Sequence, residues 1–480
     1  MLPPKSLRDS VTRAEILFAF KMIDSHTPLN FCVDLNDLLK EAFPDSEIAQ
    51  NLKLSKTKAS YVINHGLAPY YERLNLQAIT KCDFLVAQFD ESLNKVSQRG
   101  QMDLHIRFVD DEGFVQTRYI SSAFLGRATA EDLLKAFKDC FPHPNLLKKI
   151  CQIGMDGPSV NWKMHRLFMD QLVEMSDTKL IDIGSCGIHV VHGAMKSGFE
   201  SSSWELQKFI RATYYVFRHS PARRAAFTFV TKSSNFPKPF VGVRWLENLS
   251  VVEHLIPLLP LLKDFVDAVK DKAVKNVSKS ASYKEMEKQL KQIDLLRARL
   301  EFFAFTAAEL EPFMREFQSN QPIAPFLYDR LQAILSSLMG RFMKAEVLKA
   351  AKNGKELVKV DPKKEKDCLP TKEVVIGFGA QRAIANAASK SSTSSLSVTF
   401  RKEAKEIMQV IVTKIHDRSP LQYNKVKHLS ALCPALIVID AKESSIRFKG
   451  WCSSLLDVNK IPTLTADKAL RQWDTLVQSG

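Results

Sequence analysis

The chain has 480 residues, enough for about two to four domains of ordinary size. Apolar residues make up 45% and charged residues 25%, a balance that excludes a wholly disordered protein. Sixty-eight Lys and Arg against 53 Asp and Glu leave a formal charge of +15, which favours a polyanionic partner, nucleic acid before an anionic membrane surface. The most apolar run, residues 255–262, is far shorter than the ~20 residues of a membrane-spanning helix, and residues 1–30 lack the continuous apolar stretch typical of a signal peptide. We expect an intracellular protein that is neither secreted nor membrane-bound.

The first eighty residues are predicted to be helical. Residues 10–24 begin with a Ser or Thr cap, and their apolar side chains recur at helical spacing. These side chains are Ile16, Leu17, Phe20 and Ile23. Residues 34–43 and 55–63 repeat the pattern, which Ala68 and Pro69 interrupt. We expect a helical N-terminal segment over residues 1–78.

A mixed α/β pattern follows from residue 81. Residues 82–89 are short and apolar, and two alternating runs, 102–109 and 114–121, enclose an acidic Gly turn that predicts an antiparallel hairpin. Thr129 and Asp132 resemble a capping box at the start of a helix. Further strands and helices are then expected at 150–155 (strand), 159–174 (helix), 179–183 (strand) and from 187 (helix). This order predicts a sheet with three antiparallel strands leading into parallel crossovers.

Helical periodicity dominates after residue 200. Helices are expected at 204–216, 282–305, 325–348 and 400–415. Two Lys-rich stretches, 263–291 and 341–372, carry much of the positive charge. Such a stretch is either a solvated helix face or linker, which is the commoner case, or a binding surface. Residues 383–397 are predicted to be a flexible connector, and 436–439 a brief strand. The eight cysteines lack paired spacing, which favours reduced thiols over a disulfide framework or a zinc finger.

Two carboxylates are the sharpest candidates for chemistry. Asp90 closes the first predicted strand of the sheet, and Asp156 closes the fourth. Acids at the ends of neighbouring strands can share divalent cations, and hard oxygen ligands favour Mg²⁺. Such metals would polarise a phosphoryl group and activate water or a 3′-hydroxyl. The structural alternative is that each Asp forms a turn or caps the following helix.

Two further clusters have a functional and a structural interpretation. Cys186, His189 and His192 lie close enough in sequence for a metal site or a Cys-His nucleophile, although buried Cys and hydrogen-bonded His are the commoner outcome. Arg244 can hold a phosphate, and Trp245 can stack on an unpaired base. The alternative for this pair is a packed Trp beside a surface Arg.

An ordered set of motifs resembles a known family. FDESLN at 89–94, FLGRATAEDLL at 124–134 and MDGPSVNW at 155–162 are followed by GSCGIHVVHGA at 184–194, SPARR at 220–224 and VRWLEN at 243–248. The series resembles hAT-superfamily transposases over roughly residues 10–440. The resemblance implies an RNase H-like core interrupted by a large helical insertion, and cut-and-paste DNA chemistry with a Mg²⁺-bound Asp-Asp-Glu triad.

The resemblance also implies roles for individual residues. Asp90 matches the first catalytic Asp of the family, and Asp156 matches the second; both would be metal ligands. Cys186 and His189 match a C-x-x-H motif that is structural or DNA-proximal. Arg244 and Trp245 match an R-W motif associated with the DNA end. The implied domains are a helical segment (1–78), an RNase H-like core (79–199), a helical insertion (200–430) and a C-terminal remnant of the core (431–480).

Departures from the family pattern shape the expected function. The third acid of the family lies in a Glu-Arg and Phe-Ser block that also carries the dimerisation region, and no such block is found in 436–480. Glu403, Glu406 and Glu443 are late acids outside a matching context, a BED-type zinc finger is not found, and Gly157 stands where many members have Asn. We expect a nuclear, transposase-derived DNA-binding protein without efficient catalysis, its oligomeric state left open. The alternatives are an active Mg²⁺-dependent transposase or nuclease with an unrecognised third acid, and a protein-interaction scaffold without DNA affinity.

Overall fold

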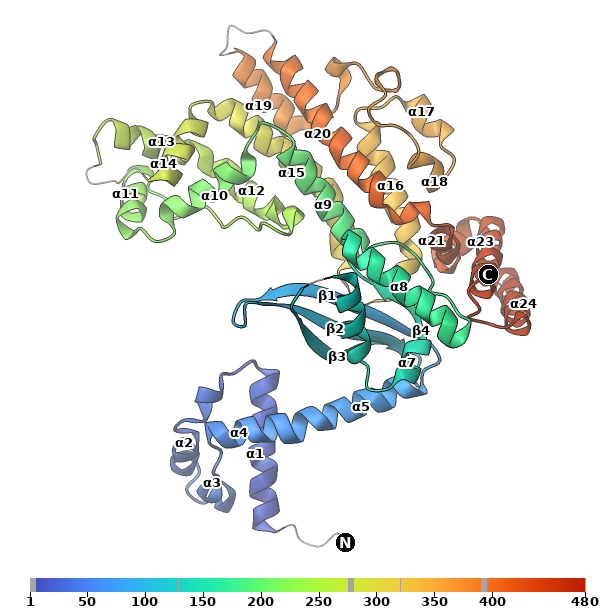
Figure 1. The fold of residues 1–480 in the computed structure, drawn as a ribbon. Helices are drawn as coiled ribbons and strands as arrows, with labels where there is room; N and C mark the ends of the chain where they lie inside the picture. Colours follow the sequence, from blue (N-terminus) through green and yellow to red (C-terminus); the bar gives the residue numbers. More distant parts are fainter. Residues whose placement is uncertain (1–5, 128, 275–279, 320, 390–394, 480) are drawn as a thin grey trace. The chain divides into compact units, whose positions relative to one another are not determined.

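The computed structural model describes residues 6–127, 129–274, 280–319, 321–389 and 395–479. Within these residues the chain is a mixed α/β protein in which helices predominate and four strands form one mixed sheet, in the order β3-β2-β1-β4 (Figure 1). It divides into two compact units, residues 1–126 with 136–150 and residues 127–135 with 151–480. The division between them passes through the segment 79–199.

The first unit begins with a group of helices, as predicted. Ser6 caps the first helix by accepting the N–H of Asp9 at 3.2 Å. The expected interruption at Ala68-Pro69 is wrong, because a π-helical turn (Ile63–Leu67) joins two helices, and Pro69 follows it near the start of the second. These helices are α1 (Leu7–Asp24), α2 (Leu35–Ala42), α3 (Glu47–Asn51), α4 (Lys56–Val62) and α5 (Ala68–Lys81).

The predicted antiparallel strands follow within the same unit. They are β1 (Leu85–Asn94), β2 (Arg99–Val109) and β3 (Val115–Leu125). The hairpin between β2 and β3 is confirmed, and Asp110 shapes its turn by accepting the N–H of Phe114 at 2.8 Å and of Glu112 at 3.1 Å. Burial alternates along β1 and β2. Phe89 and Leu104 are paired across the two strands and are both buried, while the residues next to them in each strand point to the opposite face of the sheet.

The next elements are also close to expectation, with one exception. Thr129 accepts the N–H of Asp132 at 3.2 Å, as in a capping box. The predicted strand at 179–183 is wrong, because Lys179 donates to Val458 O and Ile181 to Cys151 O, so no repeated ladder forms with one neighbour. The elements are α6 (Ala130–Asp139), α7 (Pro144–Lys148), β4 (Ile150–Gly154), α8 (Ser159–Ser176) and α9 (Gly187–Glu200).

Helices make up the rest of the described chain. The brief strand expected at 436–439 is wrong: Pro434 starts a helix there, and Val438 and Ile439 are more than 80% exposed. The predicted connector 383–397 is helical up to Ser389, and residues 390–394 lie outside the described part. No described helix is both long and apolar enough to cross a bilayer. The helices are α10 (Leu206–Phe217), α11 (Pro221–Thr231), α12 (Leu249–Leu255), α13 (Leu259–Lys270), α14 (Ala281–Leu290), α15 (Ile293–Phe317), α16 (Leu327–Gly340), α17 (Ala345–Ala350), α18 (Gly354–Leu357), α19 (Phe378–Ser389), α20 (Leu396–Arg418), α21 (Asn424–Leu429), α22 (Pro434–Ile439), α23 (Ala441–Leu456) and α24 (Thr463–Ser479).

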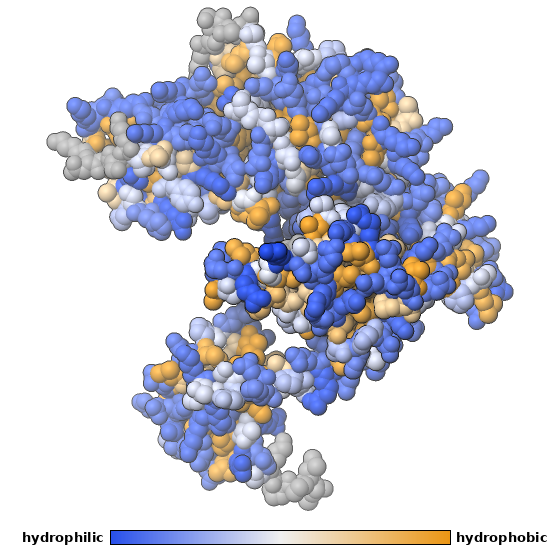
Figure 2. Space-filling model, viewed as in Figure 1, coloured by the Kyte–Doolittle hydropathy of each residue, from blue (hydrophilic) through white to orange (hydrophobic). Residues whose placement is uncertain are grey.

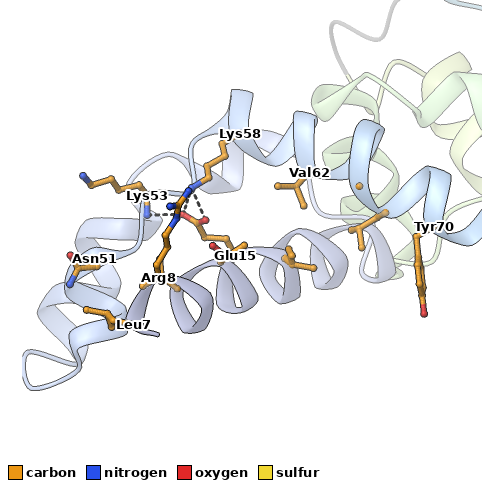
Figure 3. Close-up of a pocket in the computed structure, with 13 residues that line it drawn as sticks. Leu7, Arg8, Glu15, Asn51, Lys53, Lys58, Val62 and Tyr70 are labelled. Atoms are coloured by element: carbon orange, nitrogen blue, oxygen red, sulfur yellow. Dashed lines mark hydrogen bonds and ion pairs between the residues drawn. The ribbon is translucent and has the colours of Figure 1, made fainter. Parts of the chain in front are cut away.

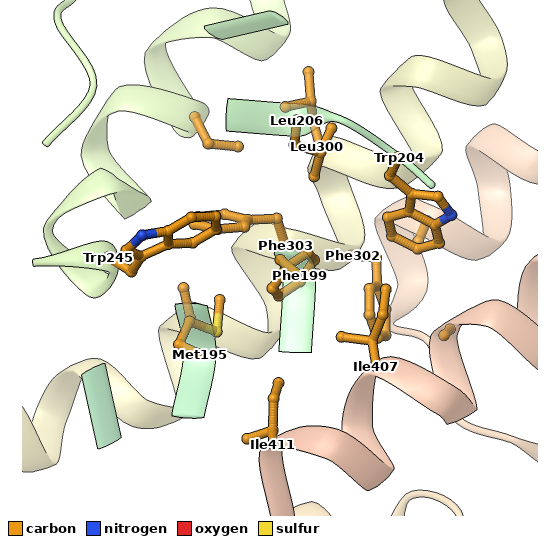
Figure 4. Packing of buried hydrophobic residues seen from close by; sticks show 14 of the residues in the cluster. Met195, Phe199, Trp204, Leu206, Trp245, Leu300, Phe302, Phe303, Ile407 and Ile411 are labelled. Atoms are coloured by element: carbon orange, nitrogen blue, oxygen red, sulfur yellow. The ribbon is translucent and has the colours of Figure 1, made fainter. Parts of the chain in front are cut away.

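One large apolar core holds the helices of the second unit together (Figure 4). Trp204 stacks on Phe400 with ring centroids 5.1 Å apart and meets the edge of Phe302 at 5.7 Å. Gly198 allows α9 to pass close to α20, because a Cβ at this position would collide with Ile411. Residues about 200 positions apart in sequence therefore form the same core.

Candidate functional site

Asp90 lies inside a strand and not at its end. The strand β1 continues to Asn94, so the prediction that Asp90 closes the strand is wrong. Its side chain is exposed and points to the face opposite Phe89, which is buried. One of its carboxylate oxygens accepts the N–H of Glu91 at 3.0 Å. The strand therefore holds Asp90 in place without covering it.

A second acid, Asp103, stands directly opposite Asp90 on β2. Side chains paired across antiparallel strands lie with Cβ atoms roughly 5 Å apart, so two carboxylates share this face. Gln101 donates to the Asp103 carboxylate at 2.7 Å, and Ser122 of β3 donates to the same oxygen. These two hydrogen bonds lower the pKa of Asp103. Sequence reasoning missed this acid, although the alternation of residues 102–109 places Asp103 on the polar face.

Asp156 lies in the loop between β4 and α8, within the second unit. It is half-buried, and its Oδ1 accepts the side-chain amide of Asn161 at 2.7 Å. Pro158, not Asp156, occupies the N-cap position of α8, so the capping alternative does not describe this residue. A Cβ at Gly157 would lie 3.4 Å from a guanidinium nitrogen of Arg418 and 3.5 Å from the Ser185 hydroxyl. Neither Arg418 nor Ser185 was among the predicted site residues.

The loop that holds Cys186 adjoins the loop of Asp156. The Cys186 N–H donates to the carbonyl of Met155 at 3.2 Å, and Cys186 is the N-cap residue of α9. Burial acts to raise the pKa of the Cys186 thiol, but hydrogen bonds and charge from His189 outweigh it, so this pKa lies below its ordinary value. The predicted pair therefore interacts, next to the start of a helix, where a thiolate is favoured.

His192 does not join that pair. Its Nδ1 accepts the N–H of Leu246 at 3.4 Å, while its Nε2 is buried without a partner among the described residues. Burial lowers the pKa of His192 to about 4. The imidazole is therefore neutral at neutral pH and acts as a packed residue of α9.

Arg244 and Trp245 occupy different environments. The Arg244 guanidinium is well exposed and forms an ion pair with Glu247 at 3.1 Å. Trp245 is only 1% exposed and packs edge-on against Phe240 at 5.2 Å. In this conformation the indole face is not available for stacking on a base, and the arrangement is that of the packed Trp and surface Arg given above as the structural alternative.

Two of the late acids lie far from Arg418 along α20, and the third is held in ion pairs. Glu403 accepts the indole N–H of Trp204 at 2.7 Å. It precedes Arg418 by fifteen residues on α20, which places the two Cα atoms about 22 Å apart along the helix axis. Glu406, on the same helix, is about 18 Å from Arg418 by the same measure. Glu443 is paired with Arg447 at 2.9 Å and Lys427 at 3.1 Å.

Carboxylate oxygens are suitable ligands for a hard cation, but neither unit brings together enough of them among the described residues to form a metal site. Asp90 and Asp103 offer oxygen ligands on one sheet face, and Asp156 offers another in the second unit; such oxygens are the ligands that Mg²⁺ prefers. Among the residues that the structure describes, no three His, Cys, Asp or Glu side chains gather in a metal-binding arrangement. Comparison with models of known families and with curated proteins finds no match for this chain.

Proposed function

We propose that this chain is a transposase-derived DNA-binding protein with an RNase H-like core, and that it does not catalyse efficient strand transfer. The observation that carries the proposal is that two loops of the second unit, 155–158 and 182–186, lie next to each other. Each loop leads into the N-terminus of a helix, and Arg418 lies against Gly157 beside them. Helix N-termini and a guanidinium favour a phosphate, which is the repeating group of a DNA backbone.

The charge of the second unit supports a polyanionic partner. Residues 341–372 contain ten Lys and Arg against five Asp and Glu. Most of these lysines are exposed: Lys349, Lys352, Lys355, Lys359, Lys363, Lys364, Lys366 and Lys372. Such a surface binds duplex DNA by releasing counterions, without reading its sequence. Contacts of this kind would position a DNA backbone, while specificity would need contacts elsewhere.

The late acids are the reason why we propose that the chain does not catalyse efficient strand transfer. Glu403 and Glu443 are engaged by Trp204 and Arg447, and Glu406 lies far from Arg418 along α20. Glu403 and Glu406 are therefore poorly placed to complete a ligand set with Asp156, and Glu443 is already held by two cations. Asp90 in the first unit and Asp156 in the second are each proposed as a Mg²⁺ ligand, and a bound Mg²⁺ would polarise a phosphoryl group.

The proposal is tested by DNA binding across a range of salt concentrations. We expect the affinity of the full chain for a labelled duplex to fall steeply with salt, since each phosphate contact releases counterions. Replacing Lys355, Lys359 and Lys363 by Glu should weaken binding and reduce the salt slope by roughly one per lost contact. The matched control replaces three exposed lysines of the first unit by Glu: Lys21, Lys56 and Lys95.

Two outcomes would favour the alternatives. An affinity that does not change with salt would indicate a protein-interaction scaffold. Mg²⁺-dependent cleavage or joining of DNA that disappears in both Asp90→Ala and Asp156→Ala would indicate an active enzyme. Nuclear localisation follows from the proposal and can be checked by microscopy of the tagged chain.

A further inference from the structure

An open groove lies among the N-terminal helices of the first unit (Figure 3). It has a volume of about 1030 Å³ and runs between α1 on one side and α4, the π-helical turn and the start of α5 on the other. Its apolar lining includes Leu7, Val11, Ile16, Val62, Leu67 and Tyr70. This volume is at the upper end of the range for binding pockets.

The groove has the length that a docked helix needs. Along α1 its lining runs from Leu7 to Ile16, ten residues whose Cα atoms span about 13.5 Å along the axis. The anchor residues of an amphipathic helix, at positions i, i+3, i+4 and i+7, span about 10.5 Å. A partner helix could therefore place all four anchors between α1 and α4.

The charges around the groove are mostly positive. The one acid of its lining, Glu15, is 3% exposed and is held by the Lys58 ammonium at 2.6 Å and the Lys53 N–H at 3.1 Å. Arg8 and the side chain of Lys53 line the same groove, are exposed, and form no ion pair with the described residues. Because Glu15 is already neutralised, an acidic partner would meet two unpaired cations and no exposed carboxylate of the lining.

Several apolar side chains of the N-terminal helices are exposed, and hydrophobic residues lie among hydrophilic ones on the face of these helices that Figure 2 shows. Ile16 is 38% exposed and Tyr70 48% exposed, and both belong to the groove lining. Phe20 continues the same surface of α1 and stacks against Tyr71 of α5 with ring centroids 6.2 Å apart. An exposed apolar surface that continues a groove marks an interaction site more often than a solvent-facing one.

We propose that this groove binds an amphipathic helix of a partner protein, whose apolar residues enter the groove and whose flanking acidic residues meet Arg8 and Lys53. The mode is that of a helix laid into a groove, with apolar anchors for affinity and charge for orientation. It does not depend on DNA binding, because all of its residues belong to the first unit and none to the loops near Asp156 or the lysines of 341–372. It gives the chain a protein partner in addition to a polyanion.

The first arm of the test probes the apolar anchors. The probe is a synthetic amphipathic peptide with Leu at i, i+3, i+4 and i+7 and Glu at the remaining outward positions, labelled for fluorescence anisotropy and titrated with the full chain. Ile16→Ser should weaken its binding roughly tenfold or more, because a buried aliphatic anchor is lost. Leu17→Ser is the matched control: Leu17 is the next residue of α1, is 55% exposed and does not line the groove, so binding should be unchanged.

The second arm probes the charges. The double variant Arg8→Glu, Lys53→Glu should weaken binding roughly fivefold at low salt, and less at high salt, because the charges are exposed. Arg13→Glu, on the same helix but outside the lining, should have little effect. A peptide with Lys in place of Glu should bind the unchanged chain more weakly than the acidic peptide. Circular dichroism of every variant establishes that the fold is retained.

Several results would overturn the proposal. It fails if the acidic peptide does not bind, or if Ile16→Ser and Leu17→Ser bind it equally well. A concentration-dependent dimer that Ile16→Ser dissociates would assign the groove to a second copy of this chain instead. A loss of DNA affinity on Arg8→Glu, Lys53→Glu as large as that of the triple Lys355, Lys359 and Lys363 variant would assign it to nucleic acid.

Discussion

The N-terminal helices and the helices of the second unit share the same apolar periodicity but use it differently. In α1, the residues at helical spacing, Ile16, Leu17, Phe20 and Ile23, are all 38–55% exposed. In α15, apolar residues at the same kind of spacing, such as Phe302 and Phe303, are fully buried. The N-terminal core comprises only a few side chains, whereas the second unit closes around one large cluster. Periodicity therefore predicts a helix in both regions, and burial only where enough other helices surround it.

The largest expected effect is the loss of stability when a Phe of the second unit is replaced by Ala, compared with the same replacement in α1. Phe302→Ala should lower the free energy of unfolding of the second unit by about 3–5 kcal/mol, since its ring packs against Phe199, Trp204 and Phe400. Phe20→Ala on α1 removes a ring that is 40% exposed and should cost less than about 1 kcal/mol. Urea denaturation of both variants measures the difference. Equal losses would contradict the comparison.

Acid should weaken the second unit through its buried histidines. Burial lowers the pKa of His192 and of His416 to about 4, below the ordinary 6.5. The unfolded chain therefore binds more protons between these values, so stability falls as the pH falls from 6.5 towards 4, by about 3 kcal/mol for each histidine. Denaturation at pH 7, 6, 5 and 4 measures this loss. His192→Gln should reduce the slope, and an unchanged slope would show that His192 is not responsible.

Two glycines of one helix provide a matched test of how closely the second unit is packed. Gly198→Ala places a methyl group against Ile411 and should destabilise the protein by about 1–3 kcal/mol. Gly193→Ala, on the same helix α9, meets nothing within 4 Å and should stabilise it by up to about 1 kcal/mol, because Ala favours the helix. Thermal melting of the two variants should shift in opposite directions. Shifts of the same sign would mean that α9 and α20 do not approach closely at Gly198.

The smallest expected effect lies on the polar sheet face of the first unit. Ser122→Ala removes one of the two hydrogen bonds that lower the pKa of Asp103. That pKa should rise towards its ordinary value, and stability at neutral pH should fall by about 1 kcal/mol. An NMR titration of the Asp103 carboxyl measures the first change. Thr117→Ala, on the same strand, should leave the pKa of Asp103 where it is.

Local patterns predicted more of the fold than of the site. The hairpin around Asp110 and the helix after Thr129 follow from turn and capping chemistry that acts within a few residues. The strands expected at 179–183 and 436–439 are wrong, because a short apolar run alone does not distinguish a strand from a helix or from an extended segment without a neighbouring strand. The lysines and the Cys186–His189 pair could be found by inspection. Asp103 could not be found in this way, because only the strand register places it opposite Asp90. Arg418 could not either, because only the packing of α20 brings it beside Gly157.

The contact between α9 and α20 has a consequence for the time course of synthesis. The ribosome completes Glu200 at the end of α9 about 200 residues before it reaches Leu396 at the start of α20. At roughly 5–20 residues per second, that interval is on the order of 10–40 s. Throughout it, the α9 surface around Gly198 and Phe199 has no α20 to cover it. The nascent chain therefore exposes an apolar surface for longer than most single domains need to fold, and transient exposure of this kind favours aggregation.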